Sequence, residues 1–195
     1  MSNASELQQQ GVRLFQQREY EAAAHTFLEA QEAYESAGLP DMAAEMMVNR
    51  GLVHRALGEY DQAIDLMQQA LEVFQSQQDE KRTAQVLGNL GGVLAAQGDK
   101  EQAAMCYRQA ADTFKALGEE ELYGQTLLAL GDLQVRSGQV MAGAATYEAG
   151  LENLDQLSGT QKILRGLLGI KNRLTGSVPP PQQTSTERDQ PDEQE

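Results

Sequence analysis

Four glycines stand forty residues apart, and this spacing constrains the fold more than any other feature of the chain. Small and large side chains return at fixed offsets from each glycine, so the chain repeats one pattern four times. A chain with this period folds as stacked copies of one small unit, because a single unit cannot bury its own apolar face. The recurring positions are Gly11, Gly51, Gly91 and Gly131; then Ala23, Ala63, Ala103 and Gly143; Phe27, Met67, Tyr107 and Tyr147; and Ala30, Ala70, Ala110 and Gly150.

The spacings within a unit are those of helices. Steps of three, four and seven residues place the apolar side chains on one helical face. Glycine and acidic residues interrupt the pattern where a helix must end, as at Gly58 and Gly98. Each unit is therefore predicted to be a helical hairpin. Its first helix carries the glycine and its second carries the two small residues, and both let a neighbouring helix approach closely.

The pattern resembles the tetratricopeptide repeat, most closely in NRGLVHRALGEYDQAIDLMQQA (49–70) and NLGGVLAAQGDKEQAAMCYRQA (89–110). The family's usual unit has about 34 residues. A unit of forty is similar to the longer-helix Pins/rapsyn/kinesin-light-chain variant. The resemblance implies an all-α fold, a right-handed superhelical solenoid of four helical hairpins plus a C-terminal capping helix. The predicted solenoid domain covers residues 1–174, with repeats at about 5–38, 41–78, 81–118 and 121–158, a capping helix at 160–174, and a disordered acidic tail containing prolines at 175–195.

Residues 160–174 and residues 175–195 differ in composition. Residues 160–174 carry an apolar stripe and only basic charges. A lid on the final hairpin is the favoured role, and the alternatives are a membrane-surface helix or a self-association surface. Residues 175–195 have four prolines and almost no apolar side chains, so they cannot offset the entropy of ordering. Glycines 143 and 150 predict that the second helix of the fourth unit is the loosest, since glycine is a poor helix former.

Charge and composition exclude several classes of function. The chain has 195 residues and a net charge of −14. Phosphate binding needs clustered Lys and Arg, so no nucleic-acid partner is expected. No apolar run approaches the roughly 18–20 residues that span a bilayer, and no signal-peptide pattern begins the chain, so no membrane partner is expected. A single cysteine excludes an internal disulfide, and we therefore expect a cytoplasmic protein.

The sequence contains no recognisable catalytic or metal-binding set, so we predict a protein that is not an enzyme and uses no cofactor or metal. His25 and His54 fall in different units and lack the neighbouring Cys or carboxylate spacing of a metal site. Cys106 stands beside a packing tyrosine, and nothing in the pattern supplies the electropositive setting of a reactive thiol. All three residues are predicted to be structural.

The resemblance implies that the first helices of the hairpins line a concave groove that binds another protein. Asn49 and Asn89 occupy equivalent positions there. In related arrays, an asparagine at this place holds the main chain of an extended peptide, since an amide both donates and accepts. The alternative is that both amides bond to a neighbouring helix. The predicted peptide-binding residues are Asn49, Asn89, Val12, Phe15, Val48, Leu52, Arg55, Leu128, Val135 and Arg136.

The third unit carries small residues on this side, among them Gly88, Gly92 and Ala95. They predict a depression that an apolar side chain of the partner fills. The alternative is that the small residues only let the helices pack more tightly. A clamp for the acidic tail of a chaperone is not expected, because only Asn49 fits the required set. The leading hypothesis is an adaptor that binds a peptide or helix of a partner in the groove. The alternative is a structural subunit that forms a homo-oligomer, or packs into a larger complex, through its ends or convex face.

Overall fold

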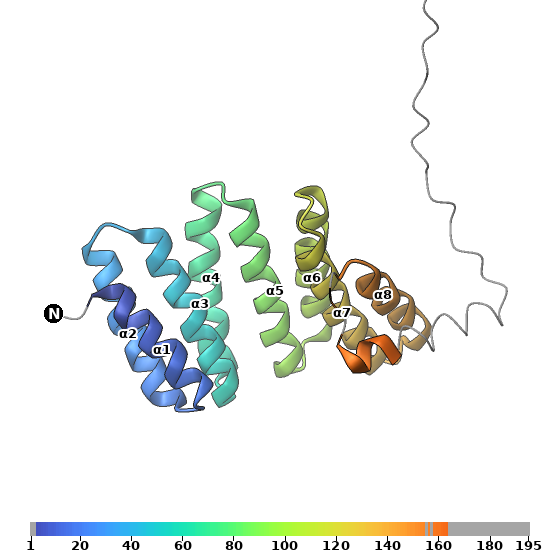
Figure 1. Ribbon diagram of the computed structural model, residues 1–195, viewed down its shortest axis with the longest axis horizontal. Helices are drawn as coiled ribbons and strands as arrows, with labels where there is room; N and C mark the ends of the chain where they lie inside the picture. The colour runs from blue at the N-terminus through green and yellow to red at the C-terminus, as the bar shows by residue number, and fades with distance from the viewer. Residues whose placement is uncertain (1–2, 155, 157, 164–195) are drawn as a thin grey trace, which may run out of the picture.

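The computed structural model describes residues 3–154, 156 and 158–163, and this part of the chain is helical without any strand. Successive helices pair as hairpins that stand side by side in chain order (Figure 1), which confirms the predicted all-α stack of four hairpins. Residues 159–163 are also helical. The remainder of the predicted capping helix and the predicted tail lie outside the described residues. The hairpins are α1 (Ala4–Gln16) with α2 (Tyr20–Ser36), α3 (Pro40–Leu57) with α4 (Tyr60–Ser76), α5 (Glu80–Gln97) with α6 (Lys100–Ala116), and α7 (Glu120–Arg136) with α8 (Val140–Glu152).

All seven turns between these helices have the same geometry. Each turn contains one residue with positive φ, in the left-handed backbone conformation. The N–H of the next residue donates to the carbonyl oxygen five residues before it, at 2.9–3.0 Å. This hydrogen bond closes the helix end and reverses the chain. The turns recur every twenty residues, so the repeat of forty consists of two similar halves. The left-handed residues are Arg18, Gly38, Gly58, Gln78, Gly98, Gly118 and Gly138.

The recurring glycines lie where the two helices of a hairpin touch. A Cβ atom on Gly11 would fall 2.6 Å from Phe27 Cε1, and one on Gly51 would fall 2.8 Å from Met67 Cε. On Gly91 it would lie 3.0 Å from the Tyr107 ring. The large residue of each second helix therefore fills the space that the glycine leaves, as the pattern predicts.

The fourth hairpin packs backbone against backbone. Gly131 faces Gly143, and Gly124 faces Gly150, so that a Cβ on any of them would lie 2.7–2.9 Å from the opposite carbonyl oxygen. The helix propensity of glycine predicts only that α8 is loose. The structure shows that its glycines serve a second purpose, since they allow α8 to approach α7 directly.

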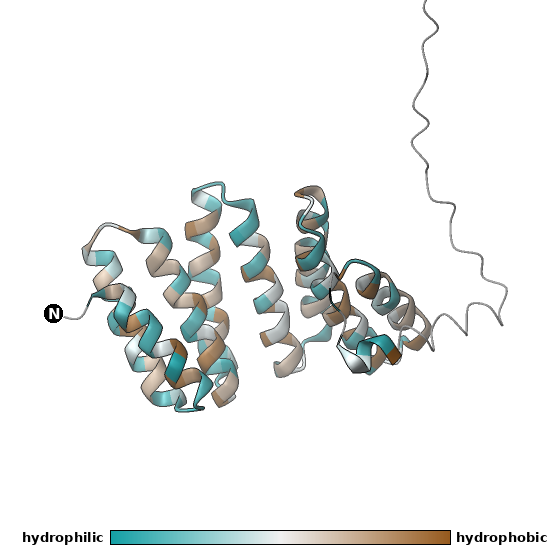
Figure 2. Ribbon diagram, viewed as in Figure 1, coloured by the Kyte–Doolittle hydropathy of each residue, from teal (hydrophilic) through white to brown (hydrophobic). Residues whose placement is uncertain are grey.

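The core lies between the two layers of helices. Polar and apolar residues alternate along every helix (Figure 2), as expected when each helix buries one face. Phe74, Met46 and Met67 are among the largest fully buried side chains. One cluster of buried residues extends from α3 to α7. Another lies in α2 and α3 and packs against partly buried residues of α1, so each cluster spans neighbouring hairpins. Among the described helices, none is long and apolar enough to cross a membrane.

Candidate peptide-binding groove

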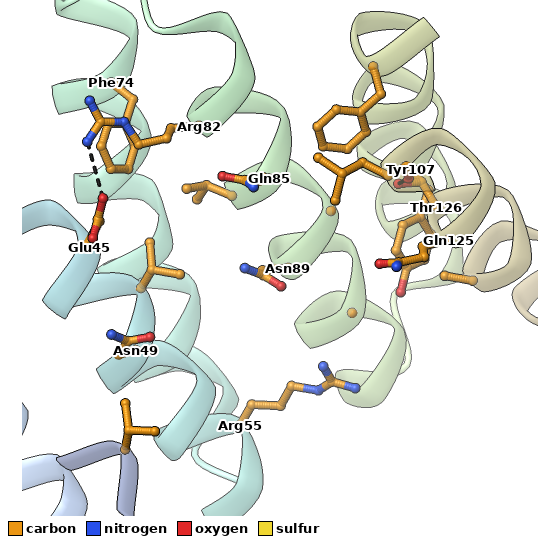
Figure 3. Close-up of a pocket in the computed structure, with 18 of the residues that line it drawn as sticks. Glu45, Asn49, Arg55, Phe74, Arg82, Gln85, Asn89, Tyr107, Gln125 and Thr126 are labelled. Carbon is orange, nitrogen blue, oxygen red and sulfur yellow. Dashed lines mark hydrogen bonds and ion pairs between the residues drawn. The ribbon is translucent and has the colours of Figure 1, made fainter. Parts of the chain in front are cut away.

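An open groove of about 860 Å³ runs across the first helix of every hairpin, α1, α3, α5 and α7 (Figure 3). Side chains from the second helices α4 and α6 also reach it. The groove is therefore a product of the stack and belongs to no single hairpin. Its lining consists of Gln8, Val12, Glu45, Val48, Asn49, Arg55, Phe74, Arg82, Gln85, Val86, Gly88, Asn89, Gly92, Tyr107, Phe114, Leu122, Gln125, Thr126 and Ala129.

The groove brings together half of the residues that the sequence predicts for it. Val12 comes from α1, the three residues Val48, Asn49 and Arg55 from α3, and Asn89 from α5. Val12 is 39% exposed, so an apolar surface on α1 is open to a partner. The predicted Arg136 instead lines a smaller adjoining pocket, where Arg55 also lies.

The remaining four predicted residues pack elsewhere. Phe15 stacks at a tilt on Tyr20, with ring centroids 5.6 Å apart, and Leu52 packs against the main core. Leu128 and Val135 face α8: their methyl groups lie 2.9 and 2.7 Å from where Gly150 and Gly143 would carry a Cβ.

On α7, the predicted residues Leu128 and Val135 lie off the face that lines the groove and the adjoining pocket, while Arg136 lies on it. Gln125 and Ala129 line the groove, and Asp132 and Arg136 continue the same face into the adjoining pocket. These positions are spaced by four, three and four residues, as one helical stripe requires. Leu128, one residue before Ala129, points about 100° away from that stripe and therefore packs against α8.

Asn49 and Asn89 lie on neighbouring helices and both are half-buried in the groove (Figure 3). Within the described part of the chain, neither side-chain amide forms a hydrogen bond, so the bond to a neighbouring helix that was the alternative role is not found. By contrast, Gln8 at the edge of the groove accepts a hydrogen bond from Tyr34 at 2.8 Å. The two asparagines thus present donors and acceptors to whatever enters the groove.

One end of the groove is acidic. Arg82 Nη1 lies 3.2 Å from both Asp41 and Glu45, and Arg82 Nε lies 2.6 Å from Asp79. The guanidinium also covers the Phe74 ring, 4.8 Å from its centroid. Three carboxylates thus surround one cation and leave this end negative, while the ion pairs tie α3 to the start of α5.

Asp79 is the N-cap of α5, and its carboxylate accepts a hydrogen bond from the backbone N–H of Arg82 at 2.8 Å. This bond, and then the bonds to the Arg82 side chain, lower the pKa of Asp79. A pKa lowered by folding stabilises the protein above the unfolded value of about 3.9, and that stability is lost as the pH falls through the folded value.

We therefore predict that Asp79→Ala lowers the free energy of unfolding by about 1 kcal/mol at pH 7. The difference from the unaltered protein should shrink below about pH 4, where the carboxylate becomes protonated. Urea denaturation of both proteins, at pH 7 and at lower pH, measures this difference in the free energy of unfolding. A difference that stays constant over this range would show that the charge on Asp79 contributes nothing.

The other end of the groove adjoins a smaller pocket of about 300 Å³, here called the basic pocket. It lies between the last turns of α3, α5 and α7, and small residues of α5 and α7 form part of its wall. The predicted depression in the third unit is thus present, although charged side chains surround it. Its lining consists of Arg55, Gly92, Ala95, Ala96, Lys100, Tyr107, Ala129, Asp132, Leu133 and Arg136.

Sequence reasoning missed the contributions of Phe74, Arg82, Tyr107 and Phe114 to the groove. Three of these are core residues of the second helices, which the repeat pattern assigns to packing alone. One signal was available, because Gly92 follows the recurring Gly91. With two glycines in succession, α5 has no side chain over the Tyr107 hydroxyl. Among the described residues, no group of three or more His, Cys, Asp or Glu is placed to hold a metal ion.

Comparisons with known proteins agree with this architecture. A family model for the tetratricopeptide repeat matches residues 42–116. A crystal structure of BtubC (BKLC) from P. vanneervenii superposes with a TM-score of 0.62 at 19% identity, over 97% of this chain and 71% of that chain. No curated protein sequence matches. The assignment to the Pins/rapsyn/kinesin-light-chain variant stays a prediction.

The repeat match and the structural match cover different parts of the chain. The family model covers the second and third hairpins, whose asparagines lie in the groove. The structural match at this identity shows the fold, which extends over all four hairpins. Tetratricopeptide repeats are in general non-catalytic modules for protein interaction. A tetratricopeptide-repeat model thus matches the second and third hairpins, and the described chain is an all-α solenoid of four helical hairpins.

Proposed function

We propose that the chain is an adaptor that binds an extended peptide of a partner protein in the groove. The observation that carries this proposal is the pair of asparagines on α3 and α5, whose amides lack partners in the described chain. An amide can donate to a peptide carbonyl and accept from a peptide N–H, so two of them in register hold a main chain of any sequence.

The walls of the groove support the same function. Val12, Val48 and Leu122 supply apolar surface between the polar residues. Peptide recognition in grooves commonly combines main-chain hydrogen bonds with apolar contacts to alternate side chains. The helices that carry these residues are held by the two clusters of buried residues, so the groove is preformed and a peptide need not order it.

The test is the double variant Asn49→Ala/Asn89→Ala. Each hydrogen-bonded amide contributes about 1 kcal/mol, so losing both should weaken a groove-bound partner about 30-fold. Partners are captured from native cell extract with tagged protein, identified by mass spectrometry, and their affinities measured with purified partner. Gln68→Ala/Gln69→Ala, which removes two exposed amides of α4, is the matched control.

We expect the control to capture the same partners as the unaltered protein. Far-ultraviolet circular dichroism should show equal helicity for all three proteins, because none of these amides supports the fold. Partners that the asparagine variant retains at full strength would move the binding site away from the groove.

A second candidate is self-assembly through the C-terminal end of the stack. Val140 and Met141 of α8 are 56% and 68% exposed, and Ile163 is 68% exposed. Burial of such side chains against a second copy would be favourable. Light scattering over a wide range of protein concentration tests this, and a monomer throughout would exclude it.

A further inference from the structure

Two hydrogen-bond donors meet in the basic pocket without an acceptor. A Cβ atom on Gly92 would lie 2.9 Å from Arg55 Nη1 and 3.4 Å from the Tyr107 hydroxyl oxygen, so both groups converge on the space that this glycine leaves. Within the described part of the chain, neither side chain has a hydrogen bond or ion pair. Burial chiefly raises the pKa of Tyr107, so its hydroxyl keeps the proton that it can donate.

The other charged groups of the pocket are already engaged. Lys100 Nζ donates to the backbone carbonyl of Arg136 at 3.1 Å, and the Arg136 side chain pairs with Asp132 at 3.0 Å. Arg55 is thus left without an ion-pair partner among the described residues, in a chain whose net charge is −14. The surrounding wall is formed by small residues, which leave room beside the guanidinium.

We propose that the basic pocket receives the side-chain carboxylate of an Asp or Glu in the bound peptide, held by Arg55 and the Tyr107 hydroxyl. This inference rests on the proposed function, because it places one residue of a peptide that the groove binds. Guanidinium and carboxylate form charge-assisted hydrogen bonds, which are stronger than those between neutral groups.

The charges at the two ends of the groove also give the peptide a direction. The cluster of Asp41, Glu45 and Asp79 outnumbers Arg82 at one end and repels an acidic side chain there. Asn49 and Asn89 lie between that end and Arg55 (Figure 3). A peptide with its acidic residue toward the last turn of α3 is favoured, and the reversed peptide is disfavoured, since like charges that meet at an interface weaken binding.

The experiment selects random linear peptides displayed on phage, with their C-termini fused so that only side chains supply carboxylates. Full-length protein is the bait, as the unaltered chain and as Arg55→Glu. Arg108→Glu, at an exposed arginine of α6 outside both cavities, makes the same change in net charge and is the control. Selected peptides are then synthesised, together with copies in which the acidic residue becomes its amide. Their affinities are measured with each of these proteins and with Asn49→Ala/Asn89→Ala.

We expect the unaltered protein to select Asp or Glu at one position of the peptides. Arg55→Glu should bind them about tenfold more weakly or worse, while Arg108→Glu binds as the unaltered protein does. Changing the peptide's acid to an amide should weaken binding to the unaltered protein but not to Arg55→Glu. Affinity should also fall with added salt. Arg55→Gln, which removes the charge without reversing it, repeats the test should Arg55→Glu lose helicity.

Other outcomes overturn the inference in distinguishable ways. Peptides that need Asn49 and Asn89 but show no acidic position would leave the proposed function intact and remove the carboxylate site. Peptides that show no acidic position and also bind Asn49→Ala/Asn89→Ala at full strength would contradict both the carboxylate site and the proposed function. A synthetic peptide of residues 183–195 that binds as tightly, and only when Arg55 is present, would assign the pocket to the chain's own acidic end and not to a partner.

Discussion

Replacing Phe74 by alanine is expected to lower the free energy of unfolding by about 3–5 kcal/mol. The side chain is 1% exposed and belongs to the cluster that joins the second hairpin to the third. Its ring also lies under the Arg82 guanidinium, at 4.8 Å, and that contact is lost with the ring. Denaturation in guanidinium chloride, followed by circular dichroism, measures the change.

The graded control for this prediction is Phe74→Leu. Leucine keeps most of the buried apolar volume and removes the ring under Arg82, so a loss of about 1–2 kcal/mol is expected. Val73→Ala, at the neighbouring half-buried position of α4, should cost less than Phe74→Ala because less apolar surface leaves the core. A cost below about 1 kcal/mol for Phe74→Ala would mean that the second and third hairpins do not depend on this contact.

Replacing Gly131 by alanine is expected to destabilise the fourth hairpin by about 2 kcal/mol. The new Cβ would lie 2.9 Å from both the Gly143 carbonyl oxygen and the Tyr147 backbone nitrogen. These are backbone atoms that cannot rotate away, so α7 and α8 must separate, and overpacking of this kind costs about 1–3 kcal/mol. The cost exceeds the gain of up to about 1 kcal/mol that alanine brings to a helix.

Gly88→Ala is the matched control, because the same chemical change should there have the opposite sign. No atom lies within 4 Å of the Cβ that Gly88 would carry, so only the helix-propensity gain remains. Hydrogen exchange locates the effect, since in a stack each repeat contacts only its neighbours. The amides of α8 should exchange faster in Gly131→Ala and those of α2 should not. Equal stability of the two variants would contradict the close backbone packing of α7 and α8.

Local patterns along the chain account for much of this structure. The recurrence of glycine and of large residues predicts the hairpins and the contact between Gly11 and Phe27, because both depend on spacing within one unit. The groove residues of α3, Val48, Asn49 and Arg55, and Asn89 of α5, were also predicted, through the resemblance to the repeat. Their helices keep the repeat pattern closely.

Contacts that depend on how closely two helices approach, or on a residue of another unit, were harder to predict. Leu128 and Val135 are apolar residues of α7 that face α8 and not the groove, because the glycines of α8 let that helix come close and offer them a surface. Arg82 was missed since its carboxylate partners Asp41 and Glu45 lie about forty residues earlier, beyond any pattern within one unit. The half-period of twenty is hard to see in the sequence, because Arg18 and Gln78 stand where the other five turns have glycine.

The pattern of residues along the chain was enough to predict the repeat, the helical hairpins and the face of α3 and α5 on which the asparagines lie. These depend on interactions within a few turns of helix, which a periodic pattern records directly. Which polar groups of the groove lack partners in the described chain could be seen only once the helices were packed together. Arg55 and Tyr107 come from different hairpins and converge at Gly92, and a rotation of one helix by a single residue would separate them. Their availability depends on how the hairpins are turned against one another, and that angle is set by packing across the whole stack.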